Sequence, residues 1–248
     1  MQIWTYSLFS VLIVSLISLI GLFTLSIKEN QLKNILIYSI SFSAGALFGD
    51  VFIHLLPEII EKNGLTVQIS TFTLLGIVIS LFIEKIIHWR HCHMPVNKTH
   101  VHRFAYMNLF GDSIHNFIDG LIIGTAYLIS IPVGLATTLA VVFHEIPQEI
   151  GDFGVLIHAG ISRKKALIYN FLTATTSILG AVIAILLSSK VEGATNMLSA
   201  FAAGSFIYIA GSDLIPELHK ETELKKSVIQ IFTFILGIAI MYGLLIIG

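Results

Sequence analysis

The chain has 248 residues, of which 55% are apolar and only 12% are charged, and its mean hydropathy is +0.89. Because soluble domains carry about 25% charged residues, this composition excludes a soluble globular protein. The formal net charge is −1, and the 14 lysines and arginines are gathered in a few short segments, so no basic face is available for nucleic acid. The single cysteine, Cys92, excludes a disulfide framework and a cysteine-rich structural zinc site.

Eight segments are long and apolar enough to cross a membrane as helices. The hydrocarbon core is about 30 Å thick and a helix rises about 1.5 Å per residue, so one span needs roughly 20 residues. The predicted spans 1 to 8 are residues 3–27, 34–56, 65–87, 104–130, 132–160, 166–189, 194–218 and 227–248. The first is too long for the apolar region of a signal peptide, so we expect a true span.

The connections between these spans are short, and the longest is the stretch 88–103. The sequence therefore predicts an all-α integral membrane protein with a single membrane domain over residues 1–248. Of its 14 lysines and arginines, only Lys62 and Lys190 fall on one side of the membrane, which leaves twelve on the other. Positive residues are retained in the cytoplasm, so we expect both termini outside, in the cell membrane.

Spans 2 and 7 share a pattern at a constant offset of 159 residues. The matching landmarks are Ala44-Gly45 with Ala203-Gly204 and Pro57-Glu58 with Pro216-Glu217. Because the two spans run in opposite directions, the match predicts an inverted repeat of spans 1–3 and 6–8 around spans 4 and 5, as in many secondary transporters. The alternative is that Leu-Leu-Pro-Glu is simply a common helix exit.

The two central spans carry polar stripes. In span 4, an arc of about 100° holds Asp112, His115, Asn116 and Asp119. In span 5, an arc of about 140° holds His144, Glu145, Gln148, Glu149 and Asp152. Burying even one charge in mid-membrane costs roughly 2.5–3.5 kcal/mol, so these groups must face a partner or a cation.

Imidazoles and carboxylates that converge from two helices are typical of sites for Zn²⁺, Fe²⁺ or Mn²⁺. The oxygens outnumber what one four-coordinate ion needs, which indicates two adjacent ions or one ion with waiting ligands. Pro147 frees the Phe143 carbonyl, which offers an extra oxygen. The alternative is a buried hydrogen-bond network that only joins the two spans.

At these residues the chain resembles the ZIP family of divalent-metal transporters. The matching pieces are His115-Asn116-x-x-Asp119-Gly120, the span 5 sequence His144-Glu145-x-Pro147-x-Glu149-x-Gly151-Asp152, and Gly49-Asp50-x-x-x-His54-Leu55-Leu56-Pro57-Glu58 in span 2. The span 5 sequence is similar to the subfamily motif HExPHExGD. The resemblance covers the whole chain.

The resemblance implies a binuclear metal site between spans 4 and 5, with His115, Asn116, Asp119, His144, Glu145 and Gln148 at ligand positions. Glu149 and Asp152 continue the motif and are candidates either as ligands or as lining of the inward exit. The resemblance also implies transport of Zn²⁺, and often of Fe²⁺, Mn²⁺ or Cd²⁺, into the cytoplasm. The transporter would be a homodimer that works by an elevator-like shift of spans 1, 4, 5 and 6. The metal is then the substrate, and no cofactor is expected.

One position departs from the subfamily motif. Its second span 5 histidine is replaced here by Gln148. An amide oxygen is a weaker ligand than imidazole, so the metal preference is open, with zinc as the first choice.

Further polar residues lie along the expected pathway. Asp50, His54 and Glu58 in span 2 are candidates for an entrance, while Asp213 and Glu217 in span 7 are candidates for an exit; helix-end solvation is the alternative for both sets. Asp112 belongs to the same pathway, and His158 could assist metal exit or serve only the structure. The loop 88–103 resembles the histidine-rich loop of the family, with His88, His91, Cys92, His93, His100 and His102 as candidates to catch released metal. A solvated loop is the alternative.

The strongest competing function is an intramembrane zinc metalloprotease. His144-Glu145-x-x-Gln148 differs by one residue from the HExxH motif, in which two histidines bind zinc and the glutamate activates water. Here the second histidine is missing and Pro147 interrupts the motif. The sequence also lacks a phosphate-binding loop for ATP-driven pumping. Composition leaves open whether the protein is a channel or a carrier and whether protons are coupled to transport.

Overall fold

The computed structural model describes residues 2–24, 29–89, 98–190 and 193–247, and within these ranges helices are the only regular structure. In chain order the elements are α1 (Gln2–Ile17), the 3-10 turn η1 (Ser18–Ile20), α2 (Gly21–Thr24), α3 (Glu29–Gly49), the π-helical turn η2 (Asp50–Leu55), α4 (Leu56–Asn63), α5 (Val67–Trp89), α6 (Lys98–Ile129), α7 (Ile131–His158), α8 (Arg163–Ala174), α9 (Thr176–Ser188), α10 (Ala194–Tyr208), the π-helical turn η3 (Ile209–Leu214), α11 (Ile215–Leu218) and α12 (Leu224–Ile247).

Each predicted span corresponds to one helix or to helices joined end to end, so the all-α prediction is confirmed. Among the described residues, six of these rods are long and apolar enough to cross a membrane, namely α1–α2, α3–α4, α5, α8–α9, α10–α11 and α12. The other two are α6 and α7, which have 32 and 28 residues and carry the acidic stripes. These polar residues lower the mean hydropathy of the two helices, so composition alone does not select them, although Asp112, Asp119, Glu145 and Glu149 are buried inside the protein.

The prediction of a loop over 88–103 is wrong in part. Helix α5 continues to Trp89 and α6 begins at Lys98, so His88, His100 and His102 are in helices. Hydropathy marks only the hydrocarbon-embedded part of a helix, whereas the backbone hydrogen bonds continue beyond it. The side chains of these three histidines, and all of His91, Cys92 and His93, lie outside the described residues.

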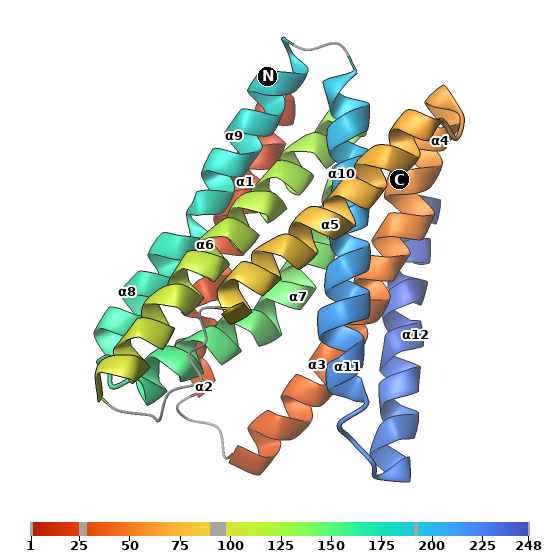
Figure 1. Ribbon diagram of the computed structural model, residues 1–248. Helices are drawn as coiled ribbons and strands as arrows, with labels where there is room; N and C mark the ends of the chain where they lie inside the picture. The colour runs from red at the N-terminus through yellow and green to blue at the C-terminus, as the bar shows by residue number, and fades with distance from the viewer. Residues whose placement is uncertain (1, 25–28, 90–97, 191–192, 248) are drawn as a thin grey trace.

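The helices form two bundles that lie side by side (Figure 1). One, which we call the site bundle, contains α1, α6, α7, α8 and α9; the other, the companion bundle, contains α3, α4, α5, α10, α11 and α12. The main helix pairs inside the bundles are α6 with α9, α3 with α12, and α5 with α10. Between the bundles, α3 packs on α7 and α10 packs on α6.

Glycines allow the closest helix contacts, and these contacts lie inside each bundle. A Cβ atom added at Gly45 of α3 would stand 2.0 Å from the carbonyl oxygen of Phe234 in α12, and one added at Gly204 of α10 would stand 1.9 Å from that of Thr73 in α5. In the site bundle, Gly120 of α6 meets the α9 backbone in the same way. Such contacts fit only glycine, so the helices of each bundle are held at fixed distances.

The inverted repeat is visible in the backbone. The π-helical turns Asp50–Leu55 and Ile209–Leu214 are separated by the same 159 residues as the sequence landmarks. Each is followed by a proline, Pro57 or Pro216, which has no N–H to give to the carbonyl four residues earlier. The helix widens there, and the N–H of Leu56 bonds to the carbonyl of Val51, five residues back.

Candidate metal centre

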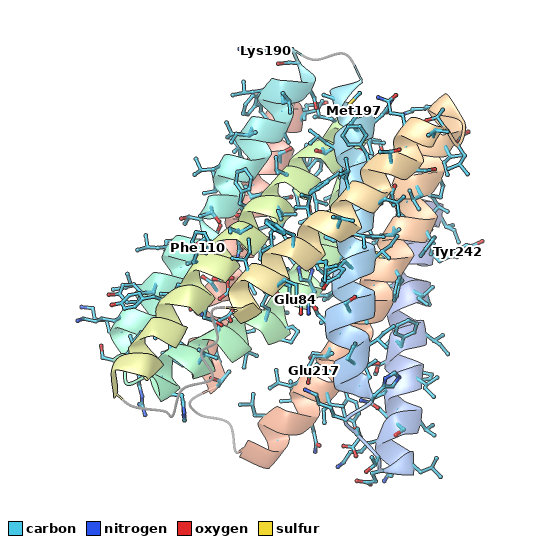
Figure 2. The ribbon with its side chains drawn as sticks, in the orientation of Figure 1. Glu84, Phe110, Lys190, Met197, Glu217 and Tyr242 are labelled. Carbon is cyan, nitrogen blue, oxygen red and sulfur yellow. The ribbon has the colours of Figure 1, made fainter. Side chains whose placement is uncertain are left out.

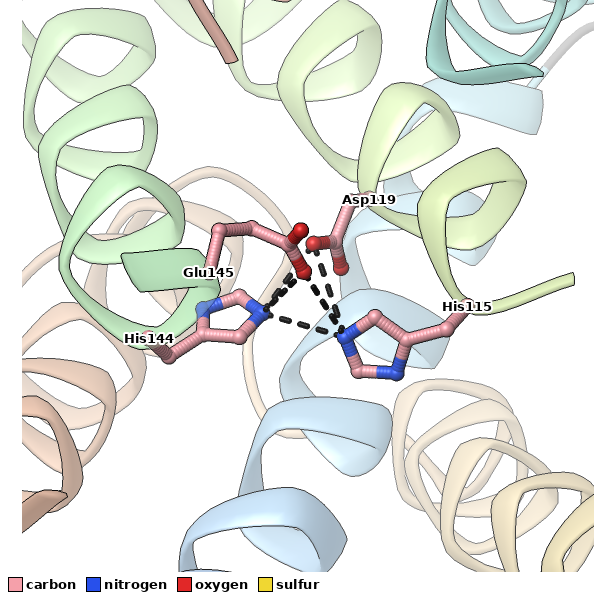
Figure 3. A group of neighbouring side chains, drawn as sticks. All are labelled: His115, Asp119, His144 and Glu145. Carbon is pink, nitrogen blue, oxygen red and sulfur yellow. Dashed lines mark hydrogen bonds and ion pairs between the residues drawn. The ribbon is translucent and has the colours of Figure 1, made fainter. Parts of the chain in front are cut away.

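Four side chains that could hold a metal ion meet between α6 and α7 (Figure 3). His115 and Asp119 come from α6, His144 and Glu145 come from α7, and one ligand atom of each lies within 4.8 Å of the others. Asp119, His144 and Glu145 are buried, while His115 is partly exposed. We call these four residues the metal cluster.

A one-residue turn sets the height of these ligands. Helix α6 ends at Ile129 and α7 begins at Ile131, and the side-chain oxygen of Ser130 accepts a hydrogen bond from the N–H of Val133 at 3.3 Å. His115 stands fifteen residues before Ser130, and Glu145 stands fifteen after it. Since both helices rise about 1.5 Å per residue, the two side chains reach the same depth.

The ligand atoms are spaced as a small cation requires. His144 Nε2 lies 3.0 Å from Asp119 Oδ2, and His115 Nε2 lies 3.3 Å from Glu145 Oε1 and 3.2 Å from His144 Nε2. The remaining two imidazole–carboxylate distances are 3.5 and 3.7 Å. Tetrahedral ligands at about 2.0–2.2 Å from Zn²⁺ are about 3.3–3.6 Å from one another.

The tautomer of His144 suits a ligand. Its Nδ1 lies 3.2 Å from the carbonyl oxygen of Ala140, one turn earlier on α7. A proton on Nδ1 makes this hydrogen bond, and Nε2 then presents its lone pair to the cluster. In this tautomer His144 Nε2 and Asp119 Oδ2, 3.0 Å apart, both present lone pairs toward the centre of the cluster.

The buried carboxylates of the cluster have no hydrogen-bond donors other than the two imidazoles. Within the described part of the chain, the oxygens of Asp119 and Glu145 have only His115 and His144 as polar neighbours of opposite character, and none of the four oxygens accepts a hydrogen bond from another residue. Leaving a buried charged oxygen without a partner is costly, and a bound cation removes that cost. This donor set fits a divalent metal ion better than a hydrogen-bond network.

A second group of oxygens lies beside the cluster. Asn116 Nδ2 donates to Asp112 Oδ1 at 2.8 Å, and Thr173 Oγ1 of α8 donates to Asp112 Oδ2 at 2.5 Å. The carboxyl group of Asp112 is close enough to Glu145 and Asp152 for their charges to interact. The Oδ1 atom of Asn116 has no hydrogen-bond partner among the described residues, so it is available to a cation.

The motif residues Glu149 and Asp152 are each held by an asparagine. Asn170 Nδ2 of α8 donates to Glu149 Oε2 at 3.0 Å, and Asn108 Nδ2 of α6 donates to Asp152 Oδ1 at 2.8 Å. The charge of Glu149 interacts with those of Asp112, Glu145 and Asp152, so all four carboxylates belong to one acidic group. Gln148 is half-buried one turn after His144.

The Phe143 carbonyl, expected as an extra oxygen, already has a partner. Pro147 removes the N–H that would bond to it inside α7, and the hydroxyl of Ser43 in α3 donates to it instead at 2.6 Å. The oxygen is thus used to join α7 to the companion bundle.

The three predicted entrance residues contact different neighbours. Asp50 is fully buried and accepts a hydrogen bond from Thr137 Oγ1 of α7 at 3.2 Å. His54 Nε2 lies 2.9 Å from the carbonyl oxygen of Met241 in α12. Glu58 pairs with Lys62 at 2.6 Å near the end of α4. Of the three, Asp50 is therefore the one shown in contact with the site bundle.

A cavity of about 120 Å³ reaches the cluster from one side, between α5, α6 and η3. His115, Glu84, Tyr208 and Asp213 are among its lining residues, and the Tyr208 hydroxyl donates to the Glu84 carboxylate. Figure 2 shows Glu84 at mid-height and Glu217 nearer the lower end.

The other two predicted exit residues are outside this cavity lining. Glu217 is exposed and forms an ion pair with Lys220. His158 is exposed at the end of α7.

Sequence reasoning missed Thr173 and Asn170 on α8 and Glu84 on α5. Span 6 has no charged residue within 166–189, which is typical of a lipid-facing or scaffold helix. The available signal was the spacing of Asn170 and Thr173, three residues apart, which places two polar side chains on one face of an apolar helix. For Glu84, the signal was a carboxylate inside an apolar span.

The chain is similar in sequence to known metal transporters. The family model described as ZIP Zinc transporter matches residues 1–104 and 90–245. "Zinc transporter ZIP13 homolog" of Drosophila melanogaster is 29% identical over 96% of this chain and 88% of its own length. "Zinc transporter ZIP13" of Pongo abelii is 33% identical over 82% of this chain and 64% of its own length. "Metal cation symporter ZIP8" of Rattus norvegicus is 28% identical over 88% of this chain and 63% of its own length.

These relatives are named as transporters, so the metalloprotease alternative has no support. The family model covers nearly the whole chain, and its description agrees with the helical rods and with the cluster of histidines and carboxylates that could hold a metal ion. The chain therefore belongs to the ZIP zinc transporter family and is an integral membrane protein that transports metal ions and is not an enzyme.

Proposed function

We propose that the protein carries Zn²⁺, and less selectively Fe²⁺, Mn²⁺ and Cd²⁺, through the metal cluster. The observation that carries this proposal is the convergence of His115 Nε2 and His144 Nε2, 3.2 Å apart, on carboxylates of Asp119 and Glu145 that accept no hydrogen bond among the described residues. Two nitrogens and two oxygens form the ligand set that borderline divalent metals prefer.

The second group of oxygens supports a second ion or a set of waiting ligands. Asn116 Oδ1 and Glu149 Oε1 are buried and have no hydrogen-bond partner among the described residues, while Asp112 and Asp152 are each fixed by a neutral donor. Fixed oxygens with little nitrogen favour harder cations than the cluster does. We place Gln148 between the metal cluster and the second group of oxygens, since its neutral amide follows His144 by one turn.

The proposed orientation of the protein in the membrane rests on the charges at the two ends. Arg163, Lys164 and Lys165 lie at the start of α8, and Lys225 and Lys226 lie at the start of α12, all at one end of the bundles, which we call the basic end. The cavity beside His115 extends toward this end as far as Gly111 of α6 and Asp213 of η3. If the basic end is cytoplasmic, this conformation is open toward the cytoplasm, and the cell membrane is the proposed location.

Alternating access is supported by the way the bundles are built. Glycine contacts too close for any Cβ fix the helices inside each bundle, as at Gly45, Gly204 and Gly120. Across the interface of the bundles, by contrast, no described glycine makes such a contact. The site bundle can then move as a rigid unit against the companion bundle, which is the elevator-type motion.

A homodimer is part of the proposal. The two candidate spans with the least burial are α5 and α12, with 11% and 17% of their apolar windows buried. Both belong to the companion bundle, so a second copy on this side would leave the site bundle free to move. Light scattering of the purified protein in detergent would give the mass of the assembly.

The function is tested by uptake of Zn²⁺, Fe²⁺, Mn²⁺ and Cd²⁺ into proteoliposomes. We expect saturable uptake by the wild type and its loss in the double variant His115→Ala/His144→Ala. His219→Ala is the matched control, because His219 is exposed and distant in sequence from the cluster.

Equal uptake by the double variant and the wild type would refute the location of the site. An identical rate for all four metals would refute the preference for zinc. Binding of a metal without uptake would refute transport by this chain.

A further inference from the structure

The hydroxyl of Ser43 faces two acceptors. It lies 2.7 Å from the carbonyl oxygen of Ser39 on its own helix and 2.6 Å from the carbonyl oxygen of Phe143 on α7. A hydroxyl has one hydrogen, so it can bond fully to only one of them at a time. The Ser39 carbonyl also accepts a backbone hydrogen bond inside α3. The Phe143 carbonyl has no backbone donor inside α7, because Pro147 has no N–H.

Ser43 connects the companion bundle to the site bundle, each of which is held rigid by its own glycine contacts. It belongs to α3 of the companion bundle, and Phe143 precedes the ligand His144 in the site bundle. A second cross-bundle bond runs from Thr137 of α7 to Asp50 of η2, the turn that continues α3. The aromatic rings of Phe42 and Phe143 also meet edge to face, 4.6 Å between centroids.

We propose that Ser43 is a positioning residue that holds α7, and through it His144, in this conformation and releases it when the site bundle moves. This inference rests on the proposed alternating access. Release is easy for the donor, because the Ser43 hydroxyl can return to the Ser39 carbonyl. The Phe143 carbonyl has no other donor when this bond breaks. The bond therefore stabilises the present conformation, and a substitution of Ser43 removes that stabilisation.

The test measures how often the cavity beside His115 is open to water. Ser80 lines this cavity, so Ser80→Cys in a Cys92→Ser background reports the present conformation through its rate of reaction with a small water-soluble thiol reagent. We expect Ser43→Ala to lower that rate, by up to about tenfold, because one buried hydrogen bond changes the equilibrium constant between the two conformations by up to about that factor.

The effect should vanish when α7 regains its own donor. In a Pro147→Ala background, the N–H at position 147 can bond to the Phe143 carbonyl, so adding Ser43→Ala should leave the labelling rate unchanged. Ser41→Ala is the matched control, because the Ser41 hydroxyl donates at 2.5 Å to the Gln230 carbonyl inside the companion bundle.

Three results would overturn the proposal: no change with Ser43→Ala, an equal change in the Pro147→Ala background, or an equal change with Ser41→Ala. Should Ser43→Ala fail to fold, the isosteric pair Ser43→Thr and Ser43→Val decides, and equal labelling of these two would also overturn it. Labelling does not require transport. A wild type that carries no metal but shows the labelling difference would therefore refute the proposed function and leave the positioning role standing.

Discussion

The substitution Gly204→Ala tests whether the contacts inside a bundle are as tight as the structure shows. The added Cβ would stand 1.9 Å from the carbonyl oxygen and 2.8 Å from the carbonyl carbon of Thr73, and 3.2 Å from the Cα of Gly76. The first distance is about 1.5 Å shorter than the 3.4 Å at which ordinary contact begins. All three atoms belong to the backbone of α5, so α5 and α10 must separate. Overpacking of this kind costs about 1–3 kcal/mol.

Gly243→Ala is the matched control for this substitution. Gly243 is also in a helix, and a Cβ added there would meet nothing within 4 Å. Alanine favours a helix over glycine by up to about 1 kcal/mol, so this variant should be as stable as the wild type or more stable.

The assay is the fraction of detergent-purified protein that remains monodisperse after heating. We expect a lower midpoint for Gly204→Ala than for Gly243→Ala. Gly45→Ala should match Gly204→Ala, because Gly45 occupies the equivalent place in the repeat and its Cβ would stand 2.0 Å from the Phe234 carbonyl oxygen. Equal midpoints for Gly204→Ala and Gly243→Ala would refute the reasoning.

Three further predictions concern the site and the topology. Gln148→His should raise the preference for Zn²⁺ over Mn²⁺ about tenfold in competition uptake, because imidazole replaces an amide oxygen; an unchanged competition profile would contradict this. Thr173→Val keeps the side-chain shape but removes the donor to Asp112, so half-saturating metal should rise about 3- to 10-fold, while equal values would show that Asp112 needs no such partner. Lys164→Cys with Cys92→Ser should react with a membrane-impermeant thiol reagent only in permeabilised cells, and labelling of intact cells would reverse the proposed orientation.

Much of the fold was accessible from the sequence because a bilayer imposes a length and a polarity on each helix. The end of α4 at Asn63 and the start of α6 at Lys98 could not be predicted, since both helices continue beyond their apolar segments. The π-helical turns were also not predicted. Proline marks their position, but whether a helix kinks, ends or widens at a proline depends on the neighbours that satisfy the freed carbonyl.

Helical periodicity predicted the polar stripes, but not which of their residues join the metal cluster and which join the second group of oxygens. An arc of 140° contains both Glu145 and Glu149, yet Glu145 joins the imidazoles while Glu149 binds Asn170. That division depends on which helix faces each side of α7, and this is tertiary information. The partners on α8 were missed for the same reason, because Asn170 and Thr173 share a face of an apolar helix but only the tertiary structure shows that this face is turned toward α6 and α7.

The one-residue turn at Ser130 limits how the chain can vary. His115 of α6 and Glu145 of α7 meet because equal lengths of helix, fifteen residues each, lead to them from this turn. Inserting one residue into α7 between Ser130 and His144 would rotate the later ligands by about 100° and raise them by about 1.5 Å relative to His115. Insertions and deletions in this helical hairpin should therefore disrupt the metal cluster more than many substitutions do. The number of residues between Ser130 and the cluster determines whether its side chains meet.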